Sequence, residues 1–239
     1  MMRVAALHRY PVKAMGGEAL GALALDARGA VGDRAFAVVD AEGLLAAGKR
    51  THRFRRRDPV FSYAARTVND AVVVSRGHGS WVVGEPALEA DLSAQMGEPM
   101  RVLGEAEAGQ RFFDDSPVSM VGTATLDWCR RELGVDADPR RLRVNVVIET
   151  SEPFVEETWI GHEVEIGGVR LRVTKRNERC RVIDLAQNGV QESAHWLKPL
   201  GDRRDACIAV YCDVVVPGEL ALGDRVTPPA PPTAPTLPS

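Results

Sequence analysis

The chain has 239 residues, 45% of them hydrophobic, and its 30 basic and 33 acidic side chains give a formal net charge of -3. This composition is typical of a globular protein of one or two domains with a sizeable core. A charge near zero excludes a protein that binds polyanions over its whole surface, so any anion site must be local.

The N-terminal stretch has no apolar region of signal-peptide length, and no run in the chain is long enough to span a bilayer. We therefore expect a cytoplasmic protein with no membrane partner. The four cysteines form no CxxC pair, which suits a reducing compartment. The five histidines have no ligand-like spacing, so a structural zinc site is not expected.

Short strands separated by turns are expected in the first half of the chain. They are Val4–His8, Leu20–Leu25, Arg34–Asp40, Ala71–Ser75 and Ser80–Val83, with turns at Gly29–Asp33 and Glu42-Gly43. Lys13 follows Tyr10-Pro11 on a loop that ends at Gly16-Gly17. Arg34 begins a strand, and its guanidinium fork matches phosphate oxygens, so we consider it an anion contact. The leucine spacing in Pro86–Gly97 predicts a short helix.

Lys49–Arg57 contains six Lys or Arg residues with His52 among them. A nucleic-acid patch is one interpretation, but no RNA-binding aromatic motif accompanies the run and the chain is acidic overall. We expect a solvated face and no nucleic-acid partner.

Helical spacing and strand alternation also organise the second half. Thr123–Leu133 predicts an amphipathic helix that buries Cys129. A hairpin around Gly167-Gly168, a buried strand with Tyr211 and a last strand are expected over Val164–Val173, Cys207–Val216 and Leu220–Val226. From Thr227 onward six of thirteen residues are proline, so 227–239 is expected to be a disordered tail outside the fold.

Two polar groups in the second half could bind a ligand. In the turn Phe112–Pro117, Ser116 either caps the following segment or contacts an anion. Arg143 and Asn145, two apart in the expected strand Val144–Ile148, should point to the same face. Together they offer charge, donors and acceptors for a heterocyclic ligand, although a surface polar ladder would use the same residues.

Cys180 lies between Arg179 and Arg181, with Lys175 and Arg176 close upstream. Adjacent guanidinium charges favour a thiolate, which binds soft metals and attacks electrophiles. A half-buried strand cysteine with solvated arginines is the other interpretation.

Several motifs follow one another along the chain: Tyr10-Pro11-Val12-Lys13, Gly32-Asp33-Arg34, Arg143-Val144-Asn145, Trp159-Ile160-Gly161, Arg179-Cys180 and Leu222-Gly223-Asp224-Arg225-Val226. In this order and spacing the chain resembles the MOSC proteins, named for the C-terminal domain of molybdenum-cofactor sulfurase, in the form with an N-terminal β-barrel extension. By motif it is most similar to the mitochondrial amidoxime-reducing components. The resemblance implies a mostly β fold with few helices: an N-terminal β-barrel-like domain over 1–104 packed on a MOSC β-barrel over 105–226.

The resemblance also implies a cofactor, a molybdopterin whose dithiolene binds molybdenum. Cys180 matches the family's catalytic cysteine, which is a ligand of the metal. The residues that match the family's contacts to the pterin and its phosphate are Lys13, Arg34, Ser116, Arg143 and Asn145. Ala14 replaces the serine that usually follows the lysine, and Asn177 stands where the family often has another cysteine. Lys49 and Arg53 are implied near the cofactor end of the N-terminal barrel.

By this resemblance the protein is a molybdenum-dependent oxidoreductase that removes oxygen from N-hydroxylated small molecules such as amidoximes. A cofactor carrier or sulfur-transfer module without turnover is the alternative, and a scaffold with a structural Cys180 is a third. The pyridoxal-phosphate half of a full sulfurase needs a considerably longer chain, so self-contained sulfurase activity is not expected.

Reduction of a substrate consumes two electrons, and the chain shows no module that supplies them. Only Cys207 and Cys212 follow Cys180, too few for an iron–sulfur cluster of the ferredoxin type, and no G-x-G-x-x-G fingerprint is present. We expect a separate donor, a ferredoxin or a flavin- or haem-containing reductase, whose acidic surface docks at Lys49–Arg57.

Overall fold

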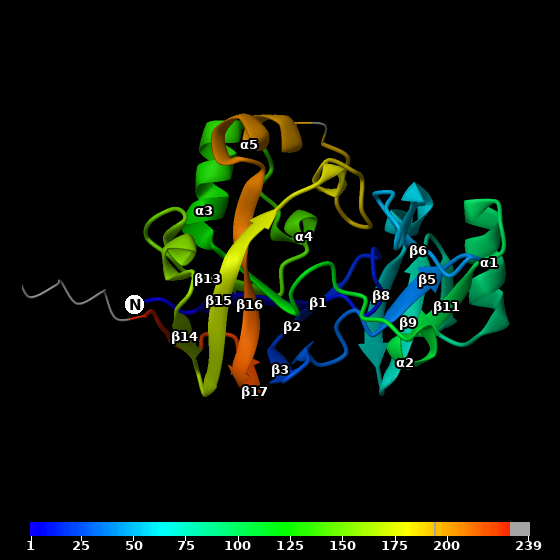
Figure 1. Ribbon diagram of the computed structural model, residues 1–239, viewed down its shortest axis with the longest axis horizontal. Helices are drawn as coiled ribbons and strands as arrows, with labels where there is room; N and C mark the ends of the chain where they lie inside the picture. Colours follow the sequence, from blue (N-terminus) through cyan, green and yellow to red (C-terminus); the bar gives the residue numbers. More distant parts are fainter. Residues whose placement is uncertain (194, 230–239) are drawn as a thin grey trace, which may run out of the picture.

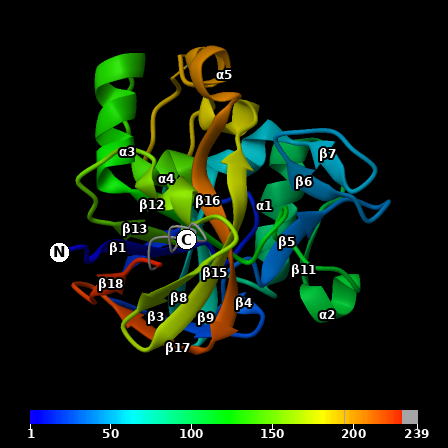
Figure 2. The ribbon, with the colours of Figure 1, turned by 60° about the vertical axis from the view of Figure 1, so that its left-hand side comes forward.

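In the computed structural model, which describes residues 1–193 and 195–229, an eight-stranded sheet forms the larger part of the fold (Figure 1, Figure 2). In order across the sheet its strands are β18 (Val226–Thr227), β14 (Glu163–Ile166), β15 (Val169–Glu178), β16 (Cys207–Val216), β12 (Val118–Gly122), β13 (Val146–Ile148), β1 (Val4–Arg9) and β2 (Glu18–Leu20). Neighbouring strands are antiparallel except for the parallel pair β12 and β13. An isolated bridge between Arg3 and Arg225 brings the start of β1 next to β18, so this large sheet curves back toward its own edge.

Three smaller sheets complete the β structure. The first contains β10 (Gly79–Val82), β9 (Ala71–Arg76) and β8 (Ala64–Val68), and the second contains β11 (Arg101–Gly104), β5 (Phe36–Val39), β6 (Leu45–Ala47) and β7 (Phe54–Arg56). The third contains β17 (Gly218–Ala221), β3 (Ala22–Asp26) and β4 (Gly29–Ala30). The predicted mostly β fold with few helices is confirmed.

The helices are short. They are α1 (Pro86–Met96), α2 (Glu105–Ala108), α3 (Thr123–Trp128), α4 (Pro139–Leu142) and α5 (Leu197–Arg204), with the 3₁₀ turns η1 (Asp58–Ser62), η3 (Val155–Trp159) and η4 (Arg181–Ile183) and the π-helical turn η2 (Cys129–Leu133). Helices α1, α3 and α5 lie at the outside of the sheets, whereas α4 lies between the large sheet and the sheets of the first half of the chain (Figure 1). Helix α1 forms where the leucine spacing predicts it, because Pro86 suits the first turn and Gly97 ends the helix with φ 75°. None of the described helices is long and apolar enough to cross a membrane.

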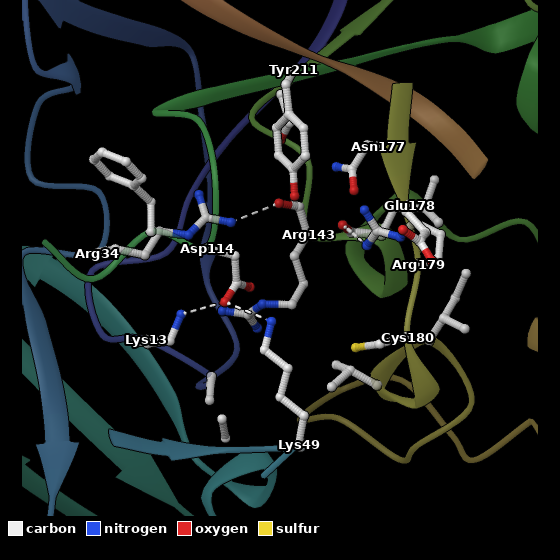
Figure 3. Close-up of a pocket in the computed structure, with 18 of the residues that line it drawn as sticks. Lys13, Arg34, Lys49, Asp114, Arg143, Asn177, Glu178, Arg179, Cys180 and Tyr211 are labelled. Carbon is white, nitrogen blue, oxygen red and sulfur yellow. Dashed lines mark hydrogen bonds and ion pairs between the residues drawn. The ribbon is translucent and has the colours of Figure 1, made fainter. Parts of the chain in front are cut away.

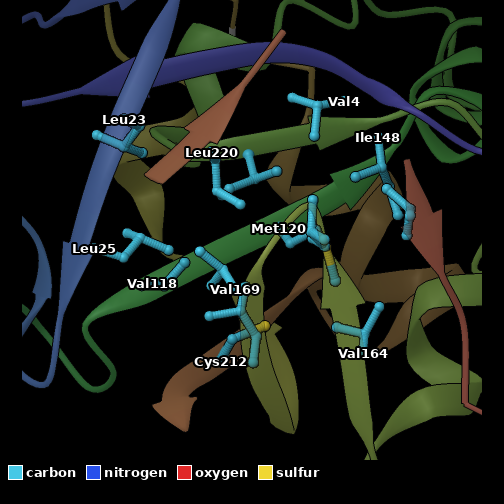
Figure 4. Packing of buried hydrophobic residues seen from close by; sticks show 14 of the residues in the cluster. Val4, Leu23, Leu25, Val118, Met120, Ile148, Val164, Val169, Cys212 and Leu220 are labelled. Atoms are coloured by element: carbon cyan, nitrogen blue, oxygen red, sulfur yellow. The ribbon is translucent and has the colours of Figure 1, made fainter. Parts of the chain in front are cut away.

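The main core lies between the large sheet and the small sheet of β17, β3 and β4 (Figure 4). Leu23, Leu25 and Leu220 of the small sheet share this buried cluster with Met120 and Val169 of the large sheet. Alternate residues of β12, β13 and β16 face the other way and pack with α3 and α5 in a second cluster. The large sheet is therefore covered on both faces, which explains why β12 and β13 are buried along their whole length.

The segment Tyr10–Gly16 connects the large sheet with two sheets of the first half of the chain, the one that contains β5 and the one that contains β8. It leaves β1 in the large sheet, and isolated bridges then tie Val12 to Phe36 and Gly16 to Ala64. Strands β1 and β2 thus belong to the same sheet as strands from the second half of the chain. The boundaries expected for the two domains, 1–104 and 105–226, stay predictions. Lys13 lies in this connecting segment, between the large sheet and the sheets that contain β5 and β8.

Two local predictions are wrong. The turn expected at Gly29–Asp33 is present over residues 31–34, but it does not join the strands Leu20–Leu25 and Arg34–Asp40. Strand β3 pairs with β4 and β17, whereas β5 pairs with β11 and β6 in another sheet. The expected last strand Leu220–Val226 is split into β17 and β18, because a turn closed by a 3.1 Å hydrogen bond from Asp224 to Ala221 interrupts it. The tail expected over 227–239 starts with Thr227 in β18, and from residue 230 it lies outside the described residues.

Candidate functional site

A pocket of about 150 Å³ opens between the large sheet and the sheets of the first half of the chain (Figure 3). The six residues predicted from the sequence as the metal ligand and the cofactor contacts line this pocket: Lys13, Arg34, Ser116, Arg143, Asn145 and Cys180. They come from segments that are far apart in the sequence and that meet only in the fold. The role of each toward a cofactor stays a prediction.

The ring of Tyr10 supports two arginines of the pocket. The guanidinium carbons of Arg34 and Arg143 lie 4.9 Å and 4.6 Å from the ring centroid. Arg34 also pairs with Asp33 and donates to the backbone oxygen of Arg143 at 2.9 Å. Burial by itself lowers the pKa of Arg34, but the adjacent Asp33 outweighs burial and raises this pKa above its ordinary value. Arg34 is therefore a fixed cation whose charge is already largely offset.

Arg143 is the less compensated cation. It ends helix α4 with φ 55°, and the strand begins only at Val146, so the prediction that Arg143 and Asn145 share a strand face is wrong. Its Nη1 donates to the backbone oxygen of Met15 at 2.6 Å, whereas Nη2 is buried and has no hydrogen-bond partner among the described residues. Burial, and then the charge of Arg34, lower the pKa of Arg143 to about 10. A buried guanidinium with an unused donor favours a bound anion.

Asn145 and Ser116 are engaged by the protein itself. Asn145 is 1% exposed, and its Oδ1 accepts hydrogen bonds from the backbone nitrogen of Ser119 at 3.1 Å and from Arg34 Nη1 at 3.4 Å. Ser116 donates to Asp213 Oδ1 at 2.8 Å, and because a strand rather than a helix follows it, the capping interpretation is wrong. Both side chains fix the pocket wall in this structure.

Lys13 and Lys49 form the other cationic end of the pocket. Lys13 Nζ donates to the backbone oxygen of Phe112 at 2.7 Å and to Asp114 Oδ1 at 3.0 Å. Lys49 Nζ lies 3.4 Å from the same carboxylate oxygen, and both ammonium groups lie over the ring of Phe54, at 4.9 Å and 4.7 Å. Burial lowers the pKa of Lys13 to about 8, although Asp114 opposes this shift.

Strand β15 carries Cys180 to the pocket, where the residue is exposed (Figure 3). Of its four basic neighbours, only Arg179 lines the pocket. The other three form ion pairs: Lys175 with Asp115, Arg176 with Glu157 and Asp205, and Arg181 with Asp58. Asp58 offsets the charge of Arg181, so Arg179 is the less compensated of the two arginines that flank Cys180.

Two more polar groups near Cys180 have unused hydrogen-bonding capacity. Arg179 donates from Nη2 to the backbone oxygen of Leu142, but its Nε is buried and has no partner in the described part of the chain. Asn177 is 3% exposed, and its Oδ1 is likewise without a partner there. Buried polar groups are normally hydrogen-bonded, so these atoms and Arg143 Nη2 leave two donors and one acceptor of the pocket residues without a partner among the described residues.

Among the pocket-lining residues that sequence reasoning did not select are Tyr211, Asn177 and Asp114. Tyr211 was expected to be buried in its strand, but it is half-buried at the pocket, where burial raises its pKa. Register shifts between β15 and β16 change which face each residue takes, so simple alternation could not place Tyr211 or Asn177. Lys49 lines the pocket as expected, whereas Arg53 donates to the backbone of Arg111 at 2.6 Å and is not among the lining residues.

Anion binding at the pocket should weaken as the pH rises through about 8, because Lys13 loses its proton there. The pKa of Lys13 is lower in the folded chain than the value of 10.5 in the unfolded chain. The buried charge therefore lowers the free energy of unfolding below pH 8, and this loss disappears as the pH rises from 8 to 10.5. Binding of sulfate, which stays a dianion, should fall about ten-fold between about pH 7 and about pH 9. Titration calorimetry measures this change. Lys13→Met should bind weakly at both pH values, and an equal pH dependence in that variant would contradict the assignment to Lys13.

The fold and the site define a mostly β protein with one thiol in a cation-lined pocket. Two family models match this chain, and each covers more than half of it: the MOSC N-terminal beta barrel domain matches residues 1–134 and the MOSC domain matches residues 100–227. The chain belongs to the MOSC proteins that carry this N-terminal domain. MOSC domains are associated with binding of the molybdenum cofactor.

The solved structures found by comparison are distant from this chain in sequence. The YUAD protein from Bacillus subtilis is 15% identical, with 95% of this chain and 94% of that chain covered and a TM-score of 0.49. YiiM from Geobacillus stearothermophilus is 12% identical over 48% of this chain and 55% of its own, with a TM-score of 0.36. No curated protein matches the chain. The family assignment therefore rests on the two family models.

Proposed function

We propose that the pocket binds a molybdenum cofactor and that the protein is an oxidoreductase that removes oxygen from N-hydroxylated small molecules. The observation that carries the proposal is the convergence of Cys180 with Lys13, Arg34 and Arg143 on one pocket. A thiolate suits a metal already bonded to sulfur, and the cations suit the anionic dithiolene and phosphate of a molybdopterin. The described residues contain no group of three His, Cys, Asp or Glu that could hold a metal ion. A single protein thiolate therefore fits a metal that arrives with ligands of its own.

Within this proposal each pocket residue has a definite task. Cys180 holds the metal, and the cofactor, when bound, supplies the two-electron chemistry of oxygen-atom removal. Arg143 Nη2, Arg179 Nε and Asn177 Oδ1 are the buried atoms that a pterin and its anionic groups can satisfy. Tyr211, whose pKa burial raises, keeps its hydroxyl proton at neutral pH and can donate a hydrogen bond into the pocket.

A cofactor carrier or sulfur-transfer module is the second candidate, because the same pocket serves it and the exposed Cys180 is open to a partner. Metal and pterin analysis of the purified chain, followed by reduction of a test amidoxime with reduced viologen, separates the two. Molybdenum, pterin and turnover support the oxidoreductase. Molybdenum and pterin without turnover favour the carrier, and a chain that retains neither contradicts both.

We also propose that electrons come from a separate protein. Three arginines in the run Lys49–Arg57 are paired within the chain, namely Arg55 with Asp40 and Glu42, Arg56 with Asp58, and Arg57 with Glu98. These pairs reduce the positive charge that the sequence indicates for the run. Lys49 is also paired, with Asp114, so the acidic surface of a donor would meet mainly Arg50 and Arg53.

The isolated chain is expected to show no turnover of an amidoxime with NADH and to show turnover with reduced viologen, since viologen needs no docking site. Absorbance of NADH and of the viologen radical measures both rates in the same cuvette. Adding a ferredoxin with its reductase should restore NADH-dependent turnover. Turnover by the chain with NADH alone would show that no partner is needed.

A further inference from the structure

The carboxylate of Asp114 occupies the cationic end of the pocket. One of its oxygens lies 3.0 Å from Lys13 Nζ and 3.4 Å from Lys49 Nζ. In Figure 3, Asp114 projects between the two lysines, with Arg143 close by. Asp114 belongs to the irregular stretch between α2 and β12, and its side chain is half exposed, so neither a helix nor a strand holds it in place. The carboxylate therefore takes the position between the lysines that an anion in this pocket would otherwise take.

The charges around Asp114 keep this contact intact across the neutral pH range. Burial by itself raises the pKa of Asp114, but Lys13 and Lys49 outweigh burial and hold this pKa well below its ordinary value. Asp114 therefore stays ionised wherever the lysines are charged. An incoming anion has to compete with a negative charge that is covalently part of the site.

We propose that Asp114 makes this end of the pocket selective for a dianionic group, such as a phosphate monoester, over a monoanion. The identity of the ligand rests on the proposed function, whereas the selectivity rests on the contacts of Asp114 alone. A monoanion in the place of the carboxylate interacts with the two lysines about as strongly as the carboxylate did, so the exchange brings no net gain. A dianion at the same distance interacts with each lysine about twice as strongly, so it displaces the carboxylate with a net gain. A phosphate monoester carries nearly two charges at neutral pH, which meets this condition.

Binding of sulfate and acetate to the full, cofactor-free chain tests the proposal. The measurement is made at constant ionic strength and at about pH 6.5, where Lys13 keeps its proton. The wild type should bind sulfate at least about ten-fold more tightly than acetate, and Asp114→Asn should gain about ten-fold or more in affinity for acetate. Asp115→Asn is the matched control, because it removes the same charge one residue away, where Asp115 pairs with Lys175 outside the pocket. This variant should keep the preference of the wild type.

An unchanged acetate affinity in folded Asp114→Asn, or a weaker sulfate affinity, overturns the proposal, because Asp114 would then be neutral toward the anion or a part of its site. If Asp114→Asn does not fold, Asp114→Ser takes its place, with the same expected gain in affinity for acetate. Equal affinity of the wild type for sulfate and acetate also overturns the proposal. The chain is measured without cofactor, so a failure to bind molybdenum contradicts the proposed function and leaves the result for Asp114 standing.

Discussion

Replacing Cys180 by serine is expected to remove molybdenum from the protein and to lower amidoxime reduction by more than about a hundred-fold, since even the outer-shell partners of metal ligands account for about ten- to a hundred-fold. Serine has the size of cysteine, but its hydroxyl is a poor ligand for a metal with soft sulfur ligands. Because Cys180 is exposed, the melting temperature should change little. Molybdenum and pterin per chain, together with the viologen-driven rate, measure the effect.

Cys207→Ser is the matched control for this variant. Cys207 is partly exposed, its Sγ lies 3.4 Å from the backbone oxygen of Asp205, and it is not among the residues that line the pocket. Cys129 and Cys212 are less useful controls because both are fully buried in the core, where any substitution also changes packing. Full molybdenum occupancy in Cys180→Ser, with loss in Cys207→Ser, would refute the assignment of Cys180.

Arg143→Met is expected to weaken retention of the cofactor about ten- to a hundred-fold, the equivalent of about 1.5 to 3 kcal/mol for one lost charge-assisted contact. No carboxylate in the described part of the chain forms an ion pair with Arg143, and burial lowers its pKa. The variant loses the hydrogen bond to the backbone oxygen of Met15 and the contact with the Tyr10 ring, but it leaves no buried carboxylate unpaired. Its free energy of unfolding should therefore fall by less than that of Arg34→Ala. Pterin released on gel filtration and chemical denaturation measure the two quantities.

Arg34→Ala gives a contrasting result, because Arg34 pairs with Asp33 and Asp33 is only 7% exposed. Removal of this arginine leaves a buried carboxylate without its partner, which costs about 3 to 5 kcal/mol of stability. Loss of cofactor in Arg34→Ala is therefore interpretable only together with its unfolding curve. The assignment of both arginines fails if folded Arg34→Ala and Arg143→Met each retain the cofactor like the wild type.

The local elements could be predicted where one short-range signal dominates. The hairpin around Gly167-Gly168 and the strand Cys207–Val216 follow from alternation and turn residues, and both elements are confirmed, although only four residues of the strand are buried. The pairing of the first strands could not be predicted, because β3 finds its partner β17 nearly two hundred residues away. Such long-range pairing depends on the whole core and leaves no mark in a local pattern.

The site shows the same division between local and long-range information. Motif order was sufficient to select the six residues that meet at the pocket, among them Lys13 and Cys180. Their partners were not predictable: Asp114 lies about a hundred residues from Lys13, and Asp58 even farther from Arg181. These carboxylates decide which cations stay open to a ligand. The sequence therefore predicts the charges of the pocket, and only the fold shows which of them are already compensated.

The molybdenum and pterin content of the purified wild-type chain, produced in a host that makes the cofactor, tests the central claim most directly. The pocket described here predicts that both copurify with the protein in equal, near-stoichiometric amounts, and that both are lost from Cys180→Ser. A folded wild-type chain that retains neither molybdenum nor pterin would contradict the account.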